Sequence, residues 1–160
     1  MDAKTSSPSP PGEPTLELGS FVPFRLNRLA SEVSEHLAGI YRERFGLDIP
    51  EWRVMATVGP TTAGCTAQYI ASNTRMHKTR VSRAIAHLEE RGLMTRVTRS
   101  DDRREMELRL TRAGRRMYSE LVPLALERES ILLASLTRDQ LRAFTTALDC
   151  LETFLGLRKG

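Results

Sequence analysis

A run of polar and basic side chains between residues 77 and 83 offers the most specific chemistry in the sequence. Arginine can pair bidentately with guanine, serine and threonine can hydrogen-bond either type of base, and lysine can hold guanine or a phosphate. Val81 and Ile85 lie at helical spacing on the opposite face, so in a helix the polar residues point outward. This pattern predicts DNA recognition by His77, Lys78, Thr79, Arg80, Ser82 and Arg83.

A second polar cluster lies at residues 100–104, between two short segments of strand-like sequence. A guanidinium at the tip of a thin β-ribbon can enter the narrow, electronegative minor groove of DNA. We therefore predict DNA contacts by Arg103 or Arg104, with Asp102 beside them to hold the guanidinium in position. Two adjacent aspartates could instead indicate a metal site, but two arginines neutralise them, so we predict no metal.

Positive charge is concentrated in the middle of the chain. Residues 73–116 hold thirteen Lys and Arg against six Asp and Glu, a net charge of +7, although the whole chain carries only +4. A basic centre with acidic flanks is typical of a surface that binds a polyanion. A solvated charged face would give the same count, so charge alone does not decide between the two.

Other classes of protein find little support in the sequence. His36, His77 and His87 lack metal-ligand spacing, and neither a phosphate-binding glycine loop nor an HExxH motif occurs. We predict neither an enzyme nor a cofactor. No apolar run of about 18 residues and no signal peptide occur; with two widely separated cysteines, this predicts a cytoplasmic protein without a membrane association. A protein-interaction module is the other alternative, and its binding would be insensitive to salt.

Periodicity and capping residues predict where the supporting elements lie. Apolar residues recur every three or four positions after Pro23, and Gly46 is a plausible stop for that helix. Thr66 is the expected N-cap of a short helix, and Thr137 with Gln140 forms a capping box. The expected elements are a flexible arm over 1–15, helices over 23–45, 50–58, 67–72 and 77–91, strands over 93–99 and 105–110, and two long helices beginning after Thr111 and Thr137.

This order of elements predicts a mainly α fold with a small β-hairpin wing (α+β), the winged helix-turn-helix, with residues 73–76 as the turn. We expect the DNA-binding lobe at 49–111 and a helical dimerisation region at 16–48 and 112–160. The last helix carries a narrow apolar seam of Leu141, Phe144, Leu148, Leu151 and Leu155. The seam could pack within the chain, but a similar stripe on the first helix favours a partner chain.

Three spaced motifs in residues 77–114 resemble the core of MarR-type regulators. They are Leu88-Glu89 with Gly92-Leu93, then Asp102-Arg103-Arg104, and Leu110-Thr111 with Gly114. The resemblance implies a homodimer joined through its first and last helices. It implies binding to a pseudo-palindromic double-stranded DNA operator, and repression that a small ligand relieves.

The resemblance also implies an effector pocket where the dimerisation helices meet the DNA-binding lobe, often for small aromatic acids. An arginine with aromatic walls suits an aromatic carboxylate. The candidate residues are Phe24, Arg25, Arg28, His36, Trp52, Arg53 and Met55. The alternative mechanism is redox sensing through Cys65, because a helix N-terminus lowers a thiol pKa. Family members that sense peroxide carry that cysteine in the first helix, where this chain has none.

Overall fold

The computed structural model describes residues 14–98 and 106–157. The chain divides into two compact units, residues 1–36 and residues 37–160. The helix–turn–helix, the wing and all of the buried core belong to the second unit. Most of the predicted arm, 1–15, lies outside the described residues, and the predicted boundaries between lobe and dimerisation region stay a prediction.

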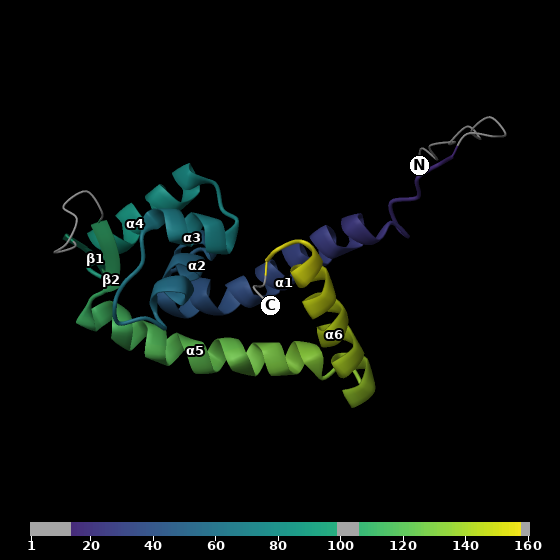
Figure 1. The fold of residues 1–160 in the computed structure, drawn as a ribbon. Helices are drawn as coiled ribbons and strands as arrows, with labels where there is room; N and C mark the ends of the chain where they lie inside the picture. The colour runs from purple at the N-terminus through teal and green to yellow at the C-terminus, as the bar shows by residue number, and fades with distance from the viewer. Residues whose placement is uncertain (1–13, 99–105, 158–160) are drawn as a thin grey trace, which may run out of the picture. The chain divides into compact units, whose positions relative to one another are not determined.

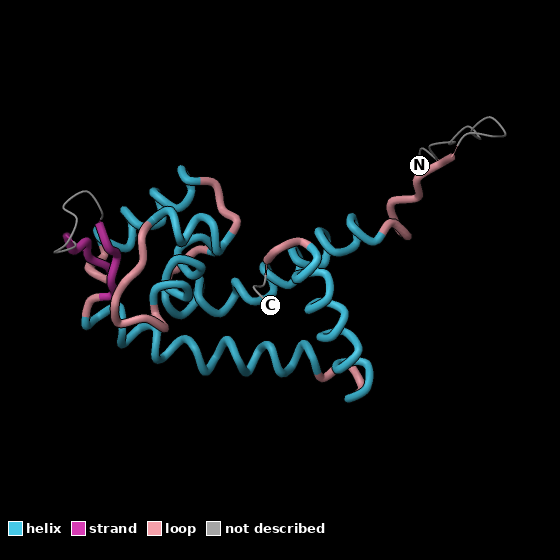
Figure 2. The backbone as a smooth tube through the Cα atoms, viewed as in Figure 1, coloured by secondary structure: helices cyan, strands magenta, loops and turns pink. Residues whose placement is uncertain are grey.

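The architecture is mainly helical with one antiparallel hairpin, which confirms the predicted fold class (Figures 1 and 2). The elements in chain order are α1 (Val22–Phe45), α2 (Ile49–Val58), α3 (Ala67–Thr74), α4 (Lys78–Glu90), β1 (Met94–Thr98), β2 (Met106–Leu110), α5 (Arg112–Leu133) and α6 (Arg138–Phe154).

Local capping chemistry sets most of the helix ends. Thr66, Thr111 and Thr137 each cap a helix with the hydroxyl oxygen, as predicted. Gly46 follows α1 at φ +60, a conformation that costs glycine little because it lacks a Cβ. One strong cap was not predicted: Asp48 accepts from the Glu51 amide at 2.7 Å, while the Glu51 carboxylate accepts from the Asp48 amide at 2.7 Å.

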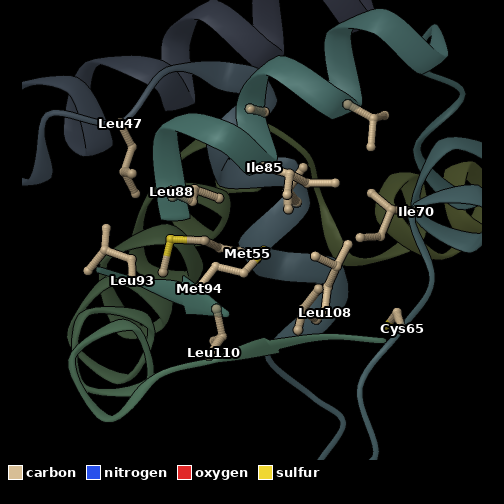
Figure 3. Close-up of a cluster of buried hydrophobic side chains, with 14 of the residues drawn as sticks. Leu47, Met55, Cys65, Ile70, Ile85, Leu88, Leu93, Met94, Leu108 and Leu110 are labelled. Atoms are coloured by element: carbon tan, nitrogen blue, oxygen red, sulfur yellow. The ribbon is translucent and has the colours of Figure 1, made fainter. Parts of the chain in front are cut away.

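The core lies among the end of α1, α2, α3, α4, the hairpin and the first half of α5, and Figure 3 shows a close-up of it. Val81, Ile85 and Leu88 of α4 are buried at spacings of four and three residues, as the sequence predicts. Leu93 and Met94 continue this buried cluster from α4 into β1. Burying an aliphatic side chain contributes roughly 1.5–3 kcal/mol, so this cluster fixes α4 to the rest of the lobe.

The hairpin pairs β1 with β2 in the register Met94↔Leu110 to Thr98↔Met106. Cys65 adds a single bridge on the other edge of β2, where its backbone exchanges hydrogen bonds of 3.1 and 2.8 Å with Leu108. No local sequence pattern indicates this bridge. It ties the α2–α3 loop to the base of the wing, at the margin of the core (Figure 3).

Two local expectations need correction. The turn was expected over 73–76, but α3 continues to Thr74, whose hydroxyl donates to the Ile70 carbonyl at 2.7 Å. In β2, the alternation of apolar and polar residues predicts that Met106, Leu108 and Leu110 share the buried face. Leu108 and Leu110 are buried, whereas Met106 is 42 % exposed. Met106 pairs with Thr98 at the loop end of the hairpin, beyond the edge of the core.

Several helical surfaces carry apolar side chains that stay exposed. No residue of α6 is buried, and Phe144, Leu151 and Leu155 of its predicted seam are all exposed. In the first unit, Phe21, Leu26 and Leu29 are exposed as well. Among the described residues, no helix is long and apolar enough to cross a membrane.

Candidate nucleic-acid interface

Helix α4 separates a buried face from a polar one. His77 is its N-cap, and the His77 Nδ1 accepts a hydrogen bond from the Thr79 amide at 3.3 Å. The six predicted DNA-contacting residues of this segment are all exposed, while the opposite face is buried. Lys78, Arg80 and Arg83 make no ion pair or hydrogen bond through their side chains to any other residue in the described part of the chain. Their charges are therefore available to a ligand.

The turn before α4 is held by one strained residue and one buried one. Arg75 ends α3 in the left-handed conformation, with φ 56, which a residue with a Cβ adopts at a cost of about 1 kcal/mol. Met76 is buried, and its amide donates to the Thr74 hydroxyl at 3.4 Å. The buried Met76 side chain compensates for the strain at Arg75 and sets where α4 begins.

Several of the basic residues counted in the sequence have structural roles instead. Arg91 donates to the Gly46 carbonyl at 2.9 Å and to the Phe45 carbonyl at 2.6 Å, which joins the end of α4 to the end of α1. Arg96 of β1 pairs with Glu89 of α4 at 2.9 Å. The net charge of +7 therefore overstates the number of cations that can face DNA.

An acidic residue supports α4 from the other side. Glu51 is 6 % exposed, caps α2, and places one carboxylate oxygen 3.5 Å from the His87 Nδ1 on α4. The Asp48-x-x-Glu51 spacing of the capping box was visible in the sequence. The Arg91 and Arg96 contacts span 45 and 7 residues, and no local pattern indicates them.

The predicted contacts at the wing tip lie outside the described residues. Asp102, Arg103 and Arg104 fall between residues 98 and 106, so their roles stay predictions. The hairpin is anchored to α4 by the pair between Arg96 and Glu89, while Glu107 pairs with Arg109 within β2 at 2.9 Å. Across the described residues, no cluster of three or more His, Cys, Asp or Glu could hold a metal ion.

The predicted effector residues are divided between the two units. In the first unit, the Arg28 guanidinium lies 5.8 Å from the centre of the Phe24 ring, while Arg25 and His36 are exposed. In the second unit, Met55 is fully buried and Arg53 is half-buried.

Trp52 takes part in an aromatic stack that sequence reasoning missed. Its ring is half-buried and lies 5.7 Å from that of Tyr41 on α1 and 6.4 Å from that of Tyr118 on α5. Such stacked pairs stabilise the packing of neighbouring elements. The stack joins α1, α2 and α5 within the second unit.

Cys65 has the opposite electrostatics to those expected of a redox sensor. Burial raises the pKa of its thiol, and the negative charge of Glu107 raises it further. The thiol lies 3.7 Å from the Thr57 carbonyl oxygen, to which it donates. The expected lowering of the pKa by the α3 N-terminus is therefore wrong, and redox control through Cys65 loses its physical basis.

Comparison with known proteins supports the same fold. The profile of the MarR family matches residues 45–105. A MarR/EmrR family transcriptional regulator from Acinetobacter sp. ADP1 superposes with a TM-score of 0.79 at 24 % identity, over 89 % of this chain and 100 % of that one. CouR from Rhodococcus jostii RHA1, bound to p-coumaroyl-CoA, gives 0.75 at 18 % identity, over 88 % and 95 %.

A third solved structure contains nucleic acid. A putative MarR family regulator from Listeria monocytogenes, complexed with 26mer DNA, gives a TM-score of 0.72 at 17 % identity, over 82 % of this chain and 86 % of that one. No sequence among the curated proteins matches the chain.

Proposed function

We propose, for a chain that belongs to the MarR-type family of winged helix-turn-helix regulators, that it binds a pseudo-palindromic operator as a homodimer and represses transcription. The observation that carries the proposal is the exposed face of α4. Lys78, Arg80 and Arg83 lie there with no protein partner among the described residues, above a face that is fully packed. The proposal assigns the chain no catalytic step and places it in the cytoplasm, where free thiols persist.

The dimensions of α4 suit the major groove of DNA. The groove is about 12 Å wide and admits one α-helix, and the residues of the first helical turns come closest to the base edges. Thr79, Arg80 and Arg83 lie in those turns. A bidentate contact from one arginine to guanine contributes about 1–3 kcal/mol of discrimination, so these residues would determine the operator sequence. Arg103 or Arg104 would add a contact in the minor groove.

Exposed apolar surface supports the homodimer. Phe154 is 86 % exposed at the end of α6, and Leu151 and Leu155 lie on the same helix. Leu26 and Leu29 form a similar exposed stripe in the first unit. A second copy would remove these surfaces from water, and a two-fold dimer would place its α4 helices about 34 Å apart, in successive major grooves. Sedimentation at micromolar concentration should give twice the mass of the 18.0 kDa chain.

We further propose that a small aromatic acid relieves repression. Phe24, Arg25, Arg28 and His36 would supply rings and cations from the first unit; Trp52, Arg53 and Met55 would contribute from the second. The p-coumaroyl-CoA bound to CouR is a precedent for an aromatic acyl ligand on this fold. In this proposal the dimer has two states that differ in the spacing of its DNA-binding lobes, and only one spacing fits the operator. The ligand can shift the balance only through different affinities for the two states, so it must bind the DNA-competent state more weakly.

Fluorescence anisotropy of a labelled duplex tests the DNA-binding function. The duplex from upstream of the chain's own gene is compared with a scrambled duplex at 50 and 200 mM salt. We expect preference for the native duplex and an affinity that falls steeply with salt, because each neutralised phosphate releases counterions. Salt-independent binding would contradict the proposal and favour a protein-interaction module. Equal weak binding to both duplexes would contradict sequence-specific regulation from this site.

A further inference from the structure

An open cavity of about 580 Å³ lies within the second unit, and no described residue of α4 lines it. Its walls come from the second half of α2, the α2–α3 loop, α3 and β2. This volume is in the range of small-molecule sites, about 300–1,000 Å³. None of the seven residues predicted to bind an aromatic acid lines it, so it is a separate candidate site.

Two residues on one wall have polar groups without protein partners. Tyr69 and Asn73 lie four residues apart on α3, so their side chains share one face of that helix. Neither the Tyr69 hydroxyl nor the Asn73 amide side chain makes a hydrogen bond within the described part of the chain. Tyr69 is 56 % exposed although it is aromatic. This wall therefore offers a ring face and an amide to a ligand.

The charge on the facing wall selects the class of ligand. Glu107 of β2 is the single charged residue among the described residues that line the cavity. Its side chain is 18 % exposed, and it pairs with Arg109, which does not line the cavity. Even beside Arg109, the negative charge of Glu107 raises the pKa of Cys65 in the cavity wall. The one formal charge in the described lining is therefore a carboxylate, which favours a cationic ligand over a carboxylate.

We propose that this cavity binds a small organic ammonium ion that carries an aromatic or short apolar group. The ammonium lies toward Glu107, and the apolar group lies against Tyr69 with Asn73 as a hydrogen-bond partner. A cation also interacts favourably with an aromatic face such as that of Tyr69. Because α3 packs on α4 and β2 pairs with β1, we expect an occupied cavity to change the DNA affinity; this consequence, unlike the binding itself, rests on the DNA-binding function proposed above.

Backbone-amide NMR of the full-length protein tests the binding without DNA. Benzylammonium is titrated against the matched anion benzoate, and the shifted amides are mapped. We expect saturable shifts with benzylammonium at Gly64, Thr66 and Asn73, and none at these positions with benzoate. Glu107→Gln should weaken benzylammonium binding about fivefold, the order expected for loss of one partly exposed ion pair.

Glu89→Gln is the matched control, because Glu89 also pairs with an arginine of the hairpin but does not line the cavity. It should leave the affinity unchanged. If Glu107→Gln does not fold, Asn73→Leu provides the second test and should also weaken binding severalfold. Equal shifts with benzoate, no shifts at these amides up to about 10 mM benzylammonium, or equal weakening by Glu89→Gln would each overturn the proposal.

Discussion

Replacing Gly114 by alanine should destabilise the protein, although a Gly→Ala change inside a helix ordinarily stabilises one. Gly114 lies in the first turn of α5, and its amide donates to the Thr111 hydroxyl at 3.1 Å. A Cβ at this position would overlap the carbonyl oxygen of Leu93. That oxygen is a backbone atom that accepts from the Thr111 amide at 3.1 Å, so it cannot move without loss of the hydrogen bond.

The magnitude follows from three contributions. Overpacking costs about 1–3 kcal/mol, and loss of the Thr111–Leu93 hydrogen bond costs about 1 kcal/mol. The gain from replacing a helical glycine offsets roughly 0.5–1 kcal/mol. We therefore expect the free energy of unfolding of Gly114→Ala to fall by about 1–3 kcal/mol.

Urea denaturation followed by circular dichroism measures this change, at one fixed protein concentration because a dimer's stability depends on concentration. Gly39→Ala in α1 is the matched control, since an added Cβ there meets no atom within 4 Å. It should raise the stability by about 0.5–1 kcal/mol. If Gly114→Ala is as stable as the unmodified protein while Gly39→Ala behaves as expected, the packing argument at the wing base is refuted.

Three further changes test other parts of the structure. Arg75→Gly should raise the free energy of unfolding by up to about 1 kcal/mol by relieving the left-handed strain at φ 56, whereas Arg75→Ala should not; equal effects in urea denaturation would argue against strain. Arg91→Lys should lower it by about 1 kcal/mol, because lysine cannot contact both the Phe45 and Gly46 carbonyls; an unchanged urea midpoint would show that this link does not stabilise the lobe. Because the pKa of Cys65 is raised in the folded protein, the contribution of its protonated thiol to stability is present below about pH 9 and is lost as the pH rises through the folded pKa. Iodoacetamide should therefore modify Cys65 more slowly than a free thiol at pH 8. Modification at an equal rate would contradict the burial.

Local patterns in the sequence predicted the secondary structure well, because capping chemistry acts over three residues. Thr66, Thr111 and Thr137 were each recognised as N-caps, and Gly46 as a helix stop. The buried face of α4 followed from spacing alone, and so did its exposed polar face. These features depend on the chain within one or two turns.

Features that depend on distant contacts were not predicted. The bridge between Cys65 and Leu108 joins segments 43 residues apart, and nothing in either segment marks it as a strand pair. The same holds for Arg91, which the sequence shows only as one of the cations of the basic segment 73–116 but which contacts the end of α1. The raised pKa of Cys65 also depends on tertiary burial and on Glu107, which the position before α3 did not reveal.

Base reading by α4 is tested by the operator affinity of Arg80→Ala beside that of Arg128→Ala. Both arginines are exposed on helices, α4 and α5, and both substitutions remove one positive charge. If α4 reads the base edges, Arg80→Ala should weaken binding at least about tenfold, while Arg128→Ala should change it little. Unchanged binding by Arg80→Ala, or an equal loss in Arg128→Ala, would contradict a sequence-reading role for the exposed face of α4.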